Sequence, residues 1–344
     1  MARRDREPPV LEVRDLSLEL SIRGRWVRAL DGVSLTIHRG EALGLVGESG
    51  SGKSLTALSV PGLLPDNARV VGGSIRVMGE DTLGRSERDL AALRARSVAF
   101  VFQNPTSYLN PMLTVGRQIA EVFEQSPELL DASGRAGALS RGERRRRAWL
   151  KSIESLRLVR IPDPDRIVRQ YPFELSGGMQ QRAVIAMALA RRPHLVIADE
   201  ITTALDVTVQ AQILSLLSEL RRQIDMTLLL ITHDLGIVAQ LADRVAVMYA
   251  GSVVESADAR SFFRAARHPY SQALLQAVPT IHGDRTVLRP IPGTMPALAA
   301  PPPGCRFHPR CPRVLEACAR IKPEPVTTGP GQAVACHLYG SPAE

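Results

Sequence analysis

The feature that most constrains this chain is a glycine-rich loop near its N-terminal end. Residues 47–54 read Gly-Glu-Ser-Gly-Ser-Gly-Lys-Ser, which fits the pattern G-x-x-x-x-G-K-[ST]. The short apolar run before it is typical of a buried strand, and a helix is expected to begin directly after it. Such a loop directs several backbone N–H groups and the positive end of a helix dipole at one point. The motif therefore predicts a site for the phosphates of a nucleoside triphosphate.

The residue types within the loop each suit this role. Gly50 and Gly52 permit positive φ and close approach of the backbone to a ligand. Lys53 is expected to reach the β- and γ-phosphates, and the Ser54 hydroxyl to ligate Mg²⁺. The predicted nucleotide contacts in the loop are Gly47, Ser49, Gly50, Ser51, Gly52, Lys53 and Ser54.

Composition narrows the class of protein further. Apolar residues make up 44% of the chain but aromatic residues only 4%, which predicts an aliphatic core of the kind found where helices cover both faces of parallel strands. There is no long apolar run, so we expect no membrane span. No apolar segment follows the charged start, so we expect no secretory signal and a cytoplasmic protein. The net charge is +8. The densest basic run, residues 141–147, has no interleaved aromatic residues and predicts a solvated helix face or proximity to anionic lipid rather than nucleic-acid binding.

Strands and helices alternate along the rest of the chain. Alternating apolar residues over 11–20 and 27–37 predict two antiparallel strands, joined by a hairpin over 21–26. From about residue 104 to 174 the pattern changes: prolines interrupt it, and Ala, Leu, Glu and Arg dominate residues 129–158, which predicts a mostly helical insertion. The other expected elements are strands over 74–78, 97–102, 195–200 and 226–232, helices over 183–191 and 207–223, and a hairpin over 244–255.

Polar side chains follow three of the predicted buried strands. They are Gln103, the pair Asp199 and Glu200, and His233. Ligands of open α/β sheets bind at the carboxyl ends of the strands, so these side chains are candidates for chemistry at the triphosphate. Asp199 suits Mg²⁺ ligation and Glu200 the polarisation of an attacking water. Gln103 suits contact with both metal and water, and His233 a hydrogen bond to the γ-phosphate.

Taken together, these motifs resemble the ATP-binding subunits of ABC transporters. The resemblance is carried by GESGSGKS, VFQNP, LSGGMQQR, LVIADE, the turn Ala204-Leu205-Asp206 and His233, and it covers about residues 10–340. It implies an α/β fold: a phosphate-loop ABC ATPase core, with a mixed sheet flanked by helices and an antiparallel β subdomain, a helical subdomain and a small cysteine-containing C-terminal extension. The implied domains are a nucleotide-binding domain over 8–265, its helical subdomain over about 104–190, and the extension over 266–344.

The resemblance also implies an ATPase that works as a head-to-tail pair. ATP lies between the phosphate loop of one subunit and residues 176–178 of the other, binding closes the pair, and hydrolysis reopens it. The implied catalytic residues are Glu200, His233 and Gln103, and the implied Mg²⁺ ligands are Ser54, Gln103 and Asp199. Further implied nucleotide contacts are Ser176, Gly177, Gly178, Gln180 and Asp206.

A narrower resemblance is to the dipeptide and oligopeptide importer branch, which also handles nickel and related solutes. It is carried by GEALGLVGESGSGKS, FQNPTSYLNPMLTVGRQI and the tail from Arg289 to Cys311, and residues 54–55 and 62–65 are more similar to the D-type of its two ATPase types. It implies a second, F-type ATPase, two permease subunits, an extracytoplasmic solute-binding protein, and a peripheral place on the cytoplasmic face of the membrane. Peptide uptake is the expected function. The alternatives are nickel or another small solute, or a soluble ABC ATPase outside transport.

Two positions depart from the family pattern. Ile201 stands where the family usually has Pro, which is expected to loosen the placement of Glu200. The aromatic residue that usually stacks on adenine aligns with Leu20, and the nearest aromatic residue is Trp26. Trp26 as the stacking residue is therefore a hypothesis, with adenine packing on Leu20 as the alternative.

All four cysteines lie late in the chain, with the spacing C-x5-C-x6-C-x17-C. They are Cys305, Cys311, Cys318 and Cys336. A cytoplasmic location disfavours disulfides, and clustered cysteines there favour a metal site. Tight C-x2-C pairs typical of zinc are absent, and wide proline-flanked loops suit a [4Fe–4S] cluster, which occurs in the branch that the tail resembles. Zinc and free thiols are the alternatives, and we expect the site to act as a structural staple.

Overall fold

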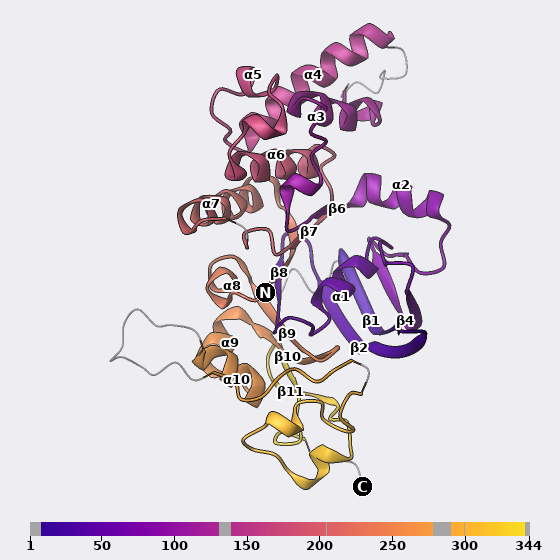
Figure 1. Ribbon diagram of the computed structural model, residues 1–344, viewed down its shortest axis with the longest axis vertical. Coiled ribbons are helices and arrows are strands. Elements are labelled where there is room, and N and C mark those ends of the chain that lie inside the picture. The colour runs from indigo at the N-terminus through magenta and orange to yellow at the C-terminus, as the bar shows by residue number, and fades with distance from the viewer. Residues whose placement is uncertain (1–7, 131–138, 204, 278–289, 299, 341–344) are drawn as a thin grey trace. The chain divides into compact units, whose positions relative to one another are not determined.

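The computed structural model describes residues 8–130, 139–203, 205–277, 290–298 and 300–340. By its internal contacts the chain divides into two compact units (Figure 1). One comprises Met1–Ser86 with Thr227–Glu344, and the other comprises Glu87–Met226. Two positions named above, Ala204 and Arg289, lie outside the described residues. Within the described ranges, no helix has the length and apolar character needed to cross a membrane.

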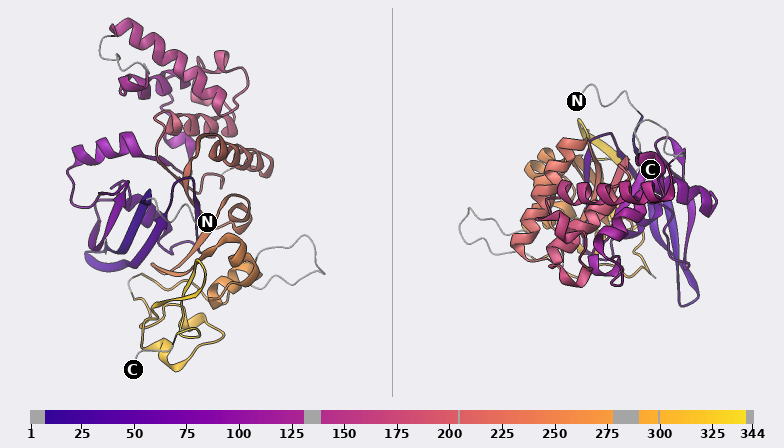
Figure 2. Two further views of the ribbon diagram at one scale, coloured as in Figure 1. Left: turned by 180° about the vertical axis from the view of Figure 1, so that it is seen from behind. Right: turned by 90° about the horizontal axis from the view of Figure 1, so that it is seen from above.

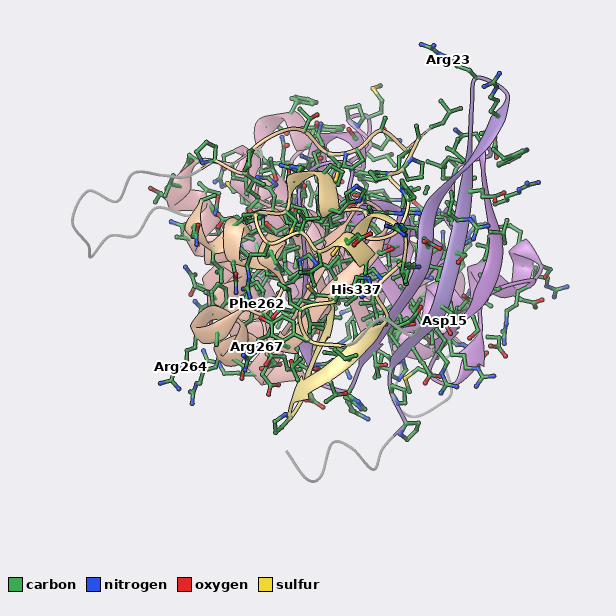
Figure 3. All side chains as sticks on the ribbon, turned by 90° about the horizontal axis from the view of Figure 1, so that it is seen from below. Asp15, Arg23, Phe262, Arg264, Arg267 and His337 are labelled. Carbon is green, nitrogen blue, oxygen red and sulfur yellow. The ribbon has the colours of Figure 1, made fainter. Side chains whose placement is uncertain are left out.

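The first unit contains the predicted antiparallel hairpin as part of a four-stranded sheet. Its order is β2 (Arg25–Ile37), β1 (Leu11–Ile22), β4 (Ala68–Val77) and β5 (Glu80–Asp81). The turn between β1 and β2 consists of Arg23 and Gly24, both with positive φ, as two-residue hairpin turns require. Arg23 projects from its tip (Figure 3). The predicted strands and their hairpin are confirmed.

Strand β4 begins earlier than the sequence suggests. The prediction placed its start after Gly72 and Gly73, but both glycines lie inside the strand. The pairing of β1 with β4 shifts between Arg14 and Ser17, and Gly73 has a φ of +88° there. A Cβ on Gly73 would lie 2.5 Å from the carbonyl oxygen of Arg14. The glycines therefore accommodate a β-bulge and do not begin the strand.

The same unit contains a mixed sheet around the strand that leads into the glycine-rich loop. Parallel pairing joins β3 (Ala42–Val46) to β8 (Thr227–Thr232) on one side and to β9 (Arg244–Tyr249) on the other. Antiparallel pairing continues the sheet from β9 through β10 and β12 to β11. The remaining strands and helices of the unit are β10 (Ser252–Asp258), β11 (Pro325–Gly329), β12 (Gln332–Ala335), α1 (Lys53–Ser59), α8 (Leu235–Leu241), α9 (Ala259–Ala265) and α10 (Pro269–Gln276).

The C-terminal extension shares the hydrophobic core of this unit. Strand β12 pairs with β10, with Val334 opposite Glu255. Phe307 is buried, and its ring lies 5.1 Å from that of Tyr249 and 5.3 Å from that of Tyr270, between ring centroids. The extension also contains two 3₁₀ turns, His308–Arg310 and Glu316–Ala319 (Figure 3 views this end of the molecule). The extension therefore gains its stability from the sheet and core of the rest of this unit.

The second unit is mainly helical, as predicted (Figure 2). Its parallel strand pair is β6 (Val98–Val101) with β7 (Leu195–Asp199). Helix α4 packs against both α3 and α6. Its helices are α2 (Glu87–Ser97), α3 (Val115–Glu124), α4 (Arg141–Leu158), α5 (Pro164–Ile167), α6 (Gly177–Leu189) and α7 (Val207–Ile224). Residues 131–138 of the predicted helical insertion lie outside the described residues.

His268 is a buried titratable group at the start of α10. The side chain is fully enclosed, and its Nδ1 accepts a hydrogen bond from the backbone N–H of Tyr270 at 3.0 Å. Its backbone N–H donates to Glu255, which is also buried. Burial lowers the pKa of His268 from 6.5 to about 3, because the imidazolium form would lose its hydration.

We predict that His268 makes the stability of this unit depend on pH. Between pH 6.5 and 3 the unfolded chain binds a proton that the folded chain excludes, so stability falls as the pH falls through this window. From pH 7 to pH 5 the loss due to this group should be about 2 kcal/mol. His268→Asn keeps a helix-capping acceptor and removes the titration. Urea unfolding at both pH values should show a smaller pH effect in the variant, and equal effects would contradict the assignment.

Candidate functional site

The glycine-rich loop connects β3 to α1, as predicted. Strand β3 ends at Val46 and α1 begins at Lys53. Gly47, Gly50 and Gly52 all have positive φ, at 153°, 80° and 104°. A Cβ on Gly47 would lie 2.2 Å from the carbonyl oxygen of Met248 in β9, so only glycine fits there. The loop is therefore folded tightly over the end of the neighbouring strand.

Lys53 lies within this loop with its ammonium group directed at the loop backbone. Its side chain is 5% exposed. Its Nζ donates to the carbonyl oxygens of Gly47 at 2.8 Å and Glu48 at 2.9 Å, and lies 3.5 Å from Ser51 Oγ. Ser54, the predicted Mg²⁺ ligand, is exposed at the start of α1. The arrangement offers a cation and an exposed hydroxyl at one turn, which suits a phosphate with its metal.

His233 lies at the same edge of the mixed sheet as the glycine-rich loop. Strands β3 and β8 are parallel, and Val46 is opposite Thr232 in their register. Gly47 and His233 each follow their strand by one residue, so the sheet brings them to adjacent strand ends. His233 is exposed.

In the second unit, Gln103 and the paired carboxylates also meet at one sheet edge. Strands β6 and β7 are parallel, with Val101 opposite Ala198. Gln103 Nε2 donates to Glu200 Oε2 at 3.2 Å, so these two predicted catalytic side chains are in direct contact. Asp199 ends β7, and Glu200 follows it with a φ of +47°.

The residue after Glu200 has a packing role. Ile201 is 3% exposed, and its side chain is part of the core. The turn after it is closed by the N–H of Thr203, which donates to the carbonyl oxygen of Glu200 at 3.2 Å. The Thr203 hydroxyl donates to the Glu200 carboxylate at 3.3 Å. A buried side chain and two local hydrogen bonds therefore hold this turn without the proline that the family usually has there.

The stretch at 176–178 lies at the N-terminus of α6. Ser176 is the N-cap, and its hydroxyl accepts from the N–H of Met179 at 3.4 Å. Ser176 and Gly177 are exposed. A Cβ on Gly178 would lie 2.5 Å from Val209 Cγ1, so α6 approaches α7 closely there. The first turn of α6 is thus open for a ligand while its other side is packed.

Three other predicted nucleotide contacts have structural partners of their own. Gln180 is buried, and its Nε2 donates to the carbonyl oxygens of Pro172 and Leu175, which holds the loop before α6. Asp206 is the N-cap of α7, where Oδ1 accepts from the N–H of Val209 at 2.9 Å. Trp26 is exposed on β2, and the guanidinium of Arg69 lies 4.1 Å from the centroid of its ring.

Sequence reasoning missed two residues that contact the glycine-rich loop from far along the chain. Tyr270 accepts a hydrogen bond from the N–H of Glu48 at 2.9 Å. Arg310, in the C-terminal extension, forms a bidentate ion pair with the Glu48 carboxylate. No local sequence signal points to either contact, because 222 and 262 residues separate the partners.

The four cysteines lie close enough to influence one another, and none forms a disulfide. Burial raises the pKa of the Cys305 thiol to about 11, and the charges of the other three cysteines act in the same direction. The backbone N–H of Cys305 donates to the carbonyl oxygen of Cys318 at 2.8 Å. Two histidines of the extension, His308 and His337, each have a ring nitrogen 2.9 Å from a backbone carbonyl oxygen.

The predicted metal cluster is not supported by the side-chain arrangement. Among the described residues, no group of three or more His, Cys, Asp or Glu side chains is arranged to hold a metal ion. A set of four thiols has the chemistry to bind iron or zinc. The expectations of a [4Fe–4S] cluster and of zinc are nevertheless not supported by the described residues.

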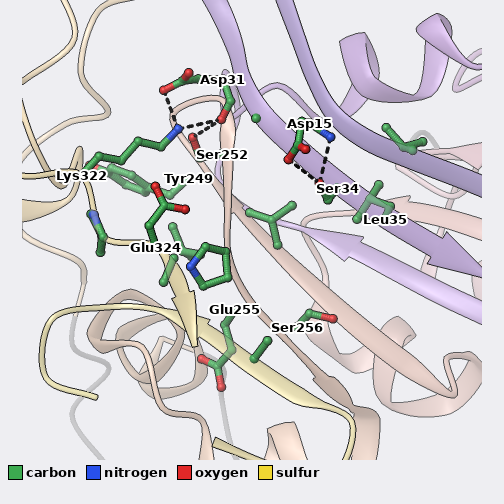
Figure 4. A pocket seen from close by; sticks show the side chains of 18 of the residues that line it. Asp15, Asp31, Ser34, Leu35, Tyr249, Ser252, Glu255, Ser256, Lys322 and Glu324 are labelled. Carbon is green, nitrogen blue, oxygen red and sulfur yellow. Dashed lines mark hydrogen bonds and ion pairs between the residues drawn. The ribbon is translucent and has the colours of Figure 1, made fainter. Parts of the chain in front are cut away.

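A separate cavity of about 530 Å³ lies in the first unit between β2, β10 and the extension (Figure 4). Several of its polar side chains pair with one another. Lys322 Nζ lies 2.9 Å from Asp31 Oδ2, and Ser34 Oγ contacts both the N–H and the carboxylate of Asp15. No residue of the glycine-rich loop lines this cavity. The cavity is therefore distinct from the predicted phosphate site.

The fold and the loop define a phosphate-loop nucleotide-binding protein, and comparison with known families narrows this class. Residues 30–203 match the family model "ABC transporter", and residues 254–318 match "Oligopeptide/dipeptide transporter, C-terminal region". The chain belongs to the ABC transporter family, as an ATP-binding protein of the branch that carries this C-terminal region. The predicted resemblance is confirmed.

Curated relatives match over nearly their whole length. The chain is 43% identical over 336 residues to the dipeptide transport ATP-binding protein DppD of Bacillus subtilis, covering 97% of this chain and 96% of that protein. It is 44% identical over 327 residues to the oligopeptide transport ATP-binding protein OppD of Salmonella typhimurium, covering 95% of this chain and 93% of that protein.

Solved structures share the fold of the ATP-binding cassette. CbiO1 of Clostridium perfringens, part of the transporter complex cbiONQ, matches with a TM-score of 0.60 and 26% identity, over 75% of this chain and 92% of that one. A dimeric post-hydrolysis state of the cassette MJ0796, bound to ADP and Pi, matches with a TM-score of 0.58 and 28% identity, over 73% and 99%. The predicted fold class is confirmed.

We predict that Gly47→Ala abolishes nucleotide binding. The added Cβ would meet a backbone oxygen at 2.2 Å, so the loop must shift. Gly24→Ala is the matched control, because Gly24 also has positive φ but its Cβ would have no neighbour within 4 Å. The control should cost about 1 kcal/mol of stability and leave binding unchanged. Equilibrium binding of a fluorescent ATP analogue and urea unfolding would measure both effects. Normal binding by Gly47→Ala would contradict the packing argument.

Proposed function

We propose that this chain is the ATP-hydrolysing subunit of an ABC importer that takes up dipeptides or oligopeptides. The observation that carries the proposal is a complete phosphate loop, with Lys53 enclosed by it, in a chain that matches peptide-transport ATP-binding proteins over almost its full length. The alternative solute is nickel or another small solute. A soluble ABC ATPase outside transport is the second alternative, and the C-terminal region shared with oligopeptide transporters argues against it.

The phosphate loop binds the triphosphate in this proposal. Residues 47–54 supply N–H groups, and Lys53 supplies the positive charge. When the triphosphate binds, the Lys53 ammonium group exchanges its hydrogen bonds to loop carbonyl oxygens for hydrogen bonds to phosphate oxygens. Mg²⁺ would be held by Ser54, Gln103 and Asp199 and would neutralise charge on the phosphates. The exposed hydroxyl of Ser54 supports this assignment.

Glu200 directs the attacking water in this proposal. Its carboxylate already accepts hydrogen bonds from Gln103 and Thr203, so its orientation is set before the nucleotide binds. A preoriented carboxylate is what proton removal from water requires. His233 donates a hydrogen bond to the γ-phosphate, and its place beside the phosphate loop at the sheet edge supports that role.

Two ATPase subunits are proposed to enclose each ATP. Ser176, Gly177 and Gly178 of one subunit would meet the triphosphate held by the other, and the exposed first turn of α6 supports this. Gln180 and Asp206 are proposed as further nucleotide contacts; Gln180 also holds the loop before α6, and Asp206 caps α7. Trp26 stays our candidate for stacking on adenine, with packing on Leu20 as the alternative.

The proposed assembly contains a second, F-type ATPase subunit, two permease subunits and an extracytoplasmic solute-binding protein, with no nucleic acid. The chain would be peripheral on the cytoplasmic face of the membrane, bound through the permeases. The proposed domains are 8–265, with a helical subdomain over about 104–190, and the extension over 266–344. The names of the relatives, which are transport ATP-binding proteins, support the assembly.

We predict that Glu200→Gln separates ATP binding from hydrolysis. The amide cannot take a proton from water, so turnover in the assembled transporter should fall by about 10²- to 10⁴-fold while ATP still binds. Glu154→Gln is the control, because Glu154 is an exposed carboxylate on α4 paired with Lys151. Phosphate release and ATP binding would be measured on the same preparations. Unchanged turnover in Glu200→Gln would refute the assignment of Glu200.

The iron–sulfur cluster stays a proposal for the four cysteines. Their common location in a small extension supports it, as does the mutual effect of their charges on thiol pKa values. Four thiolates close together need a compensating positive charge, which iron would supply. Chemical analysis of the full-length protein purified without oxygen should find about four iron and four sulfide per chain. Zinc alone, or no metal, would refute the cluster.

A further inference from the structure

The second residue of the phosphate loop is held by residues outside the loop at both its backbone and its side chain. The N–H of Glu48 donates to the hydroxyl of Tyr270 at 2.9 Å. The carboxylate of Glu48 accepts from both terminal nitrogens of Arg310, at 3.0 and 3.2 Å. Glu48 occupies one of the positions that the motif leaves unspecified, so its identity is not explained by phosphate binding.

Arg310 is fixed in place by the extension that carries it. Its side chain is 6% exposed. Its Nε donates to the carbonyl oxygen of Pro292 at 2.7 Å, and one terminal nitrogen donates to the hydroxyl of Tyr249 at 3.3 Å. Burial lowers the pKa of Arg310, but the hydrogen bonds to Glu48 and Tyr249 outweigh it and raise the pKa overall. The guanidinium is therefore a rigid, charged fork whose geometry matches a carboxylate.

Glu48 also borders the cation of the site. Its carbonyl oxygen accepts from Lys53 Nζ at 2.9 Å, and the carbonyl of Gly47 does so at 2.8 Å. A change in the backbone conformation at Glu48 would therefore move both its N–H and the carbonyl oxygen that accepts from Lys53. If Glu48 moved away from Arg310, the buried guanidinium would lose its counter-charge. Arg310 therefore strongly favours a single position of Glu48.

The extension contacts the environment of the loop at a second point. Arg306 donates to the carbonyl oxygen of Ala250 and to Asp31 Oδ2, and its side chain is 13% exposed. Gly251, the residue after Ala250, donates its N–H to the carbonyl oxygen of Ser51 in the phosphate loop at 2.8 Å. Two arginines of one short segment thus support the loop, one directly and one through the turn between β9 and β10.

We propose that Arg310 is a positioning residue for ATP: through Glu48, the C-terminal extension holds the phosphate loop in the shape that binds the triphosphate. This inference rests on the proposed function, because it concerns the same site. It assigns the extension a role in the ATP cycle of its own subunit. In this proposal Arg310 acts on the nucleotide site through Glu48.

A double-mutant cycle on the full-length chain tests the proposal. The variants are Arg310→Gln, Glu48→Gln and the two combined, with Arg310→Lys as the conservative change. Arg320→Gln is the matched control, because Arg320 lies in the same extension and pairs with Glu316 at an exposed site. The measurements are the Kd of a fluorescent ATP analogue with Mg²⁺, and the thermal unfolding midpoint without nucleotide.

We expect Arg310→Gln and Glu48→Gln each to raise the Kd about tenfold, and the combined variant to raise it no further. Arg310→Lys keeps the charge without the fork and should be intermediate, and Arg320→Gln should bind like the unmodified chain. A merely structural role would lower the unfolding midpoint of Arg310→Gln and leave the Kd of Glu48→Gln unchanged. Because Glu48 is partly exposed, Glu48→Gln tests the proposal even if Arg310→Gln fails to fold.

Two outcomes overturn the inference: additive effects of the two substitutions, or an unchanged Kd in Glu48→Gln. Failure of the proposed function looks different. In that case the unmodified chain does not bind the ATP analogue, or Lys53→Ala binds it equally well. If the unmodified chain binds, Lys53→Ala does not, and Glu48→Gln binds normally, only the role of Arg310 is refuted.

Discussion

The close packing of Gly47 against the carbonyl oxygen of Met248 is the constraint on which the nucleotide site depends. A side chain at Gly47 would meet that oxygen at 2.2 Å, so the backbone of the loop lies directly on the end of β9. This contact gives the loop its curvature, which encloses Lys53 and turns its ammonium toward loop carbonyl oxygens. The same strand end supplies Tyr249 and the turn at Ala250 and Gly251, which the extension contacts. The site and its support therefore share one strand.

Local patterns predicted the parts of the fold that local chemistry determines. Alternating apolar residues placed β1 and β2, and the strand–loop–helix order placed the phosphate loop. The start of β4 was predicted wrongly because glycine is favoured both in a β-bulge and before a strand, as at Gly72 and Gly73. Only the pairing with β1 distinguishes the two cases. The addition of β11 and β12 to the sheet was not predictable either. Strand β12 pairs with β10, which is distant in sequence, and strand pairing over such a distance leaves no periodic signal; β11 joins the sheet only through β12.

The candidate site divides in the same way. Gln103, Glu200 and His233 could be proposed from the sequence because each follows a buried strand. Within each unit, parallel register brings such positions to one end of the strand pair. Gln180 and Asp206 have structural roles that the motifs did not reveal: Gln180 holds the loop before α6, and Asp206 caps α7. Arg310 was missed because an ion pair between residues 262 positions apart has no counterpart in spacing or composition.

The extension also completes the edge of the mixed sheet. Strand β12 satisfies hydrogen-bonding groups of β10, and β11 forms the outer strand beyond it, beginning with Pro325 and carrying two threonines. A proline and short polar strands are the means by which proteins keep a sheet from recruiting further strands. A protein cut short before β12 would expose the polar backbone of β10 beside the apolar ring of Tyr270. Other polypeptide chains could pair with this exposed strand edge, so we expect such a fragment to aggregate.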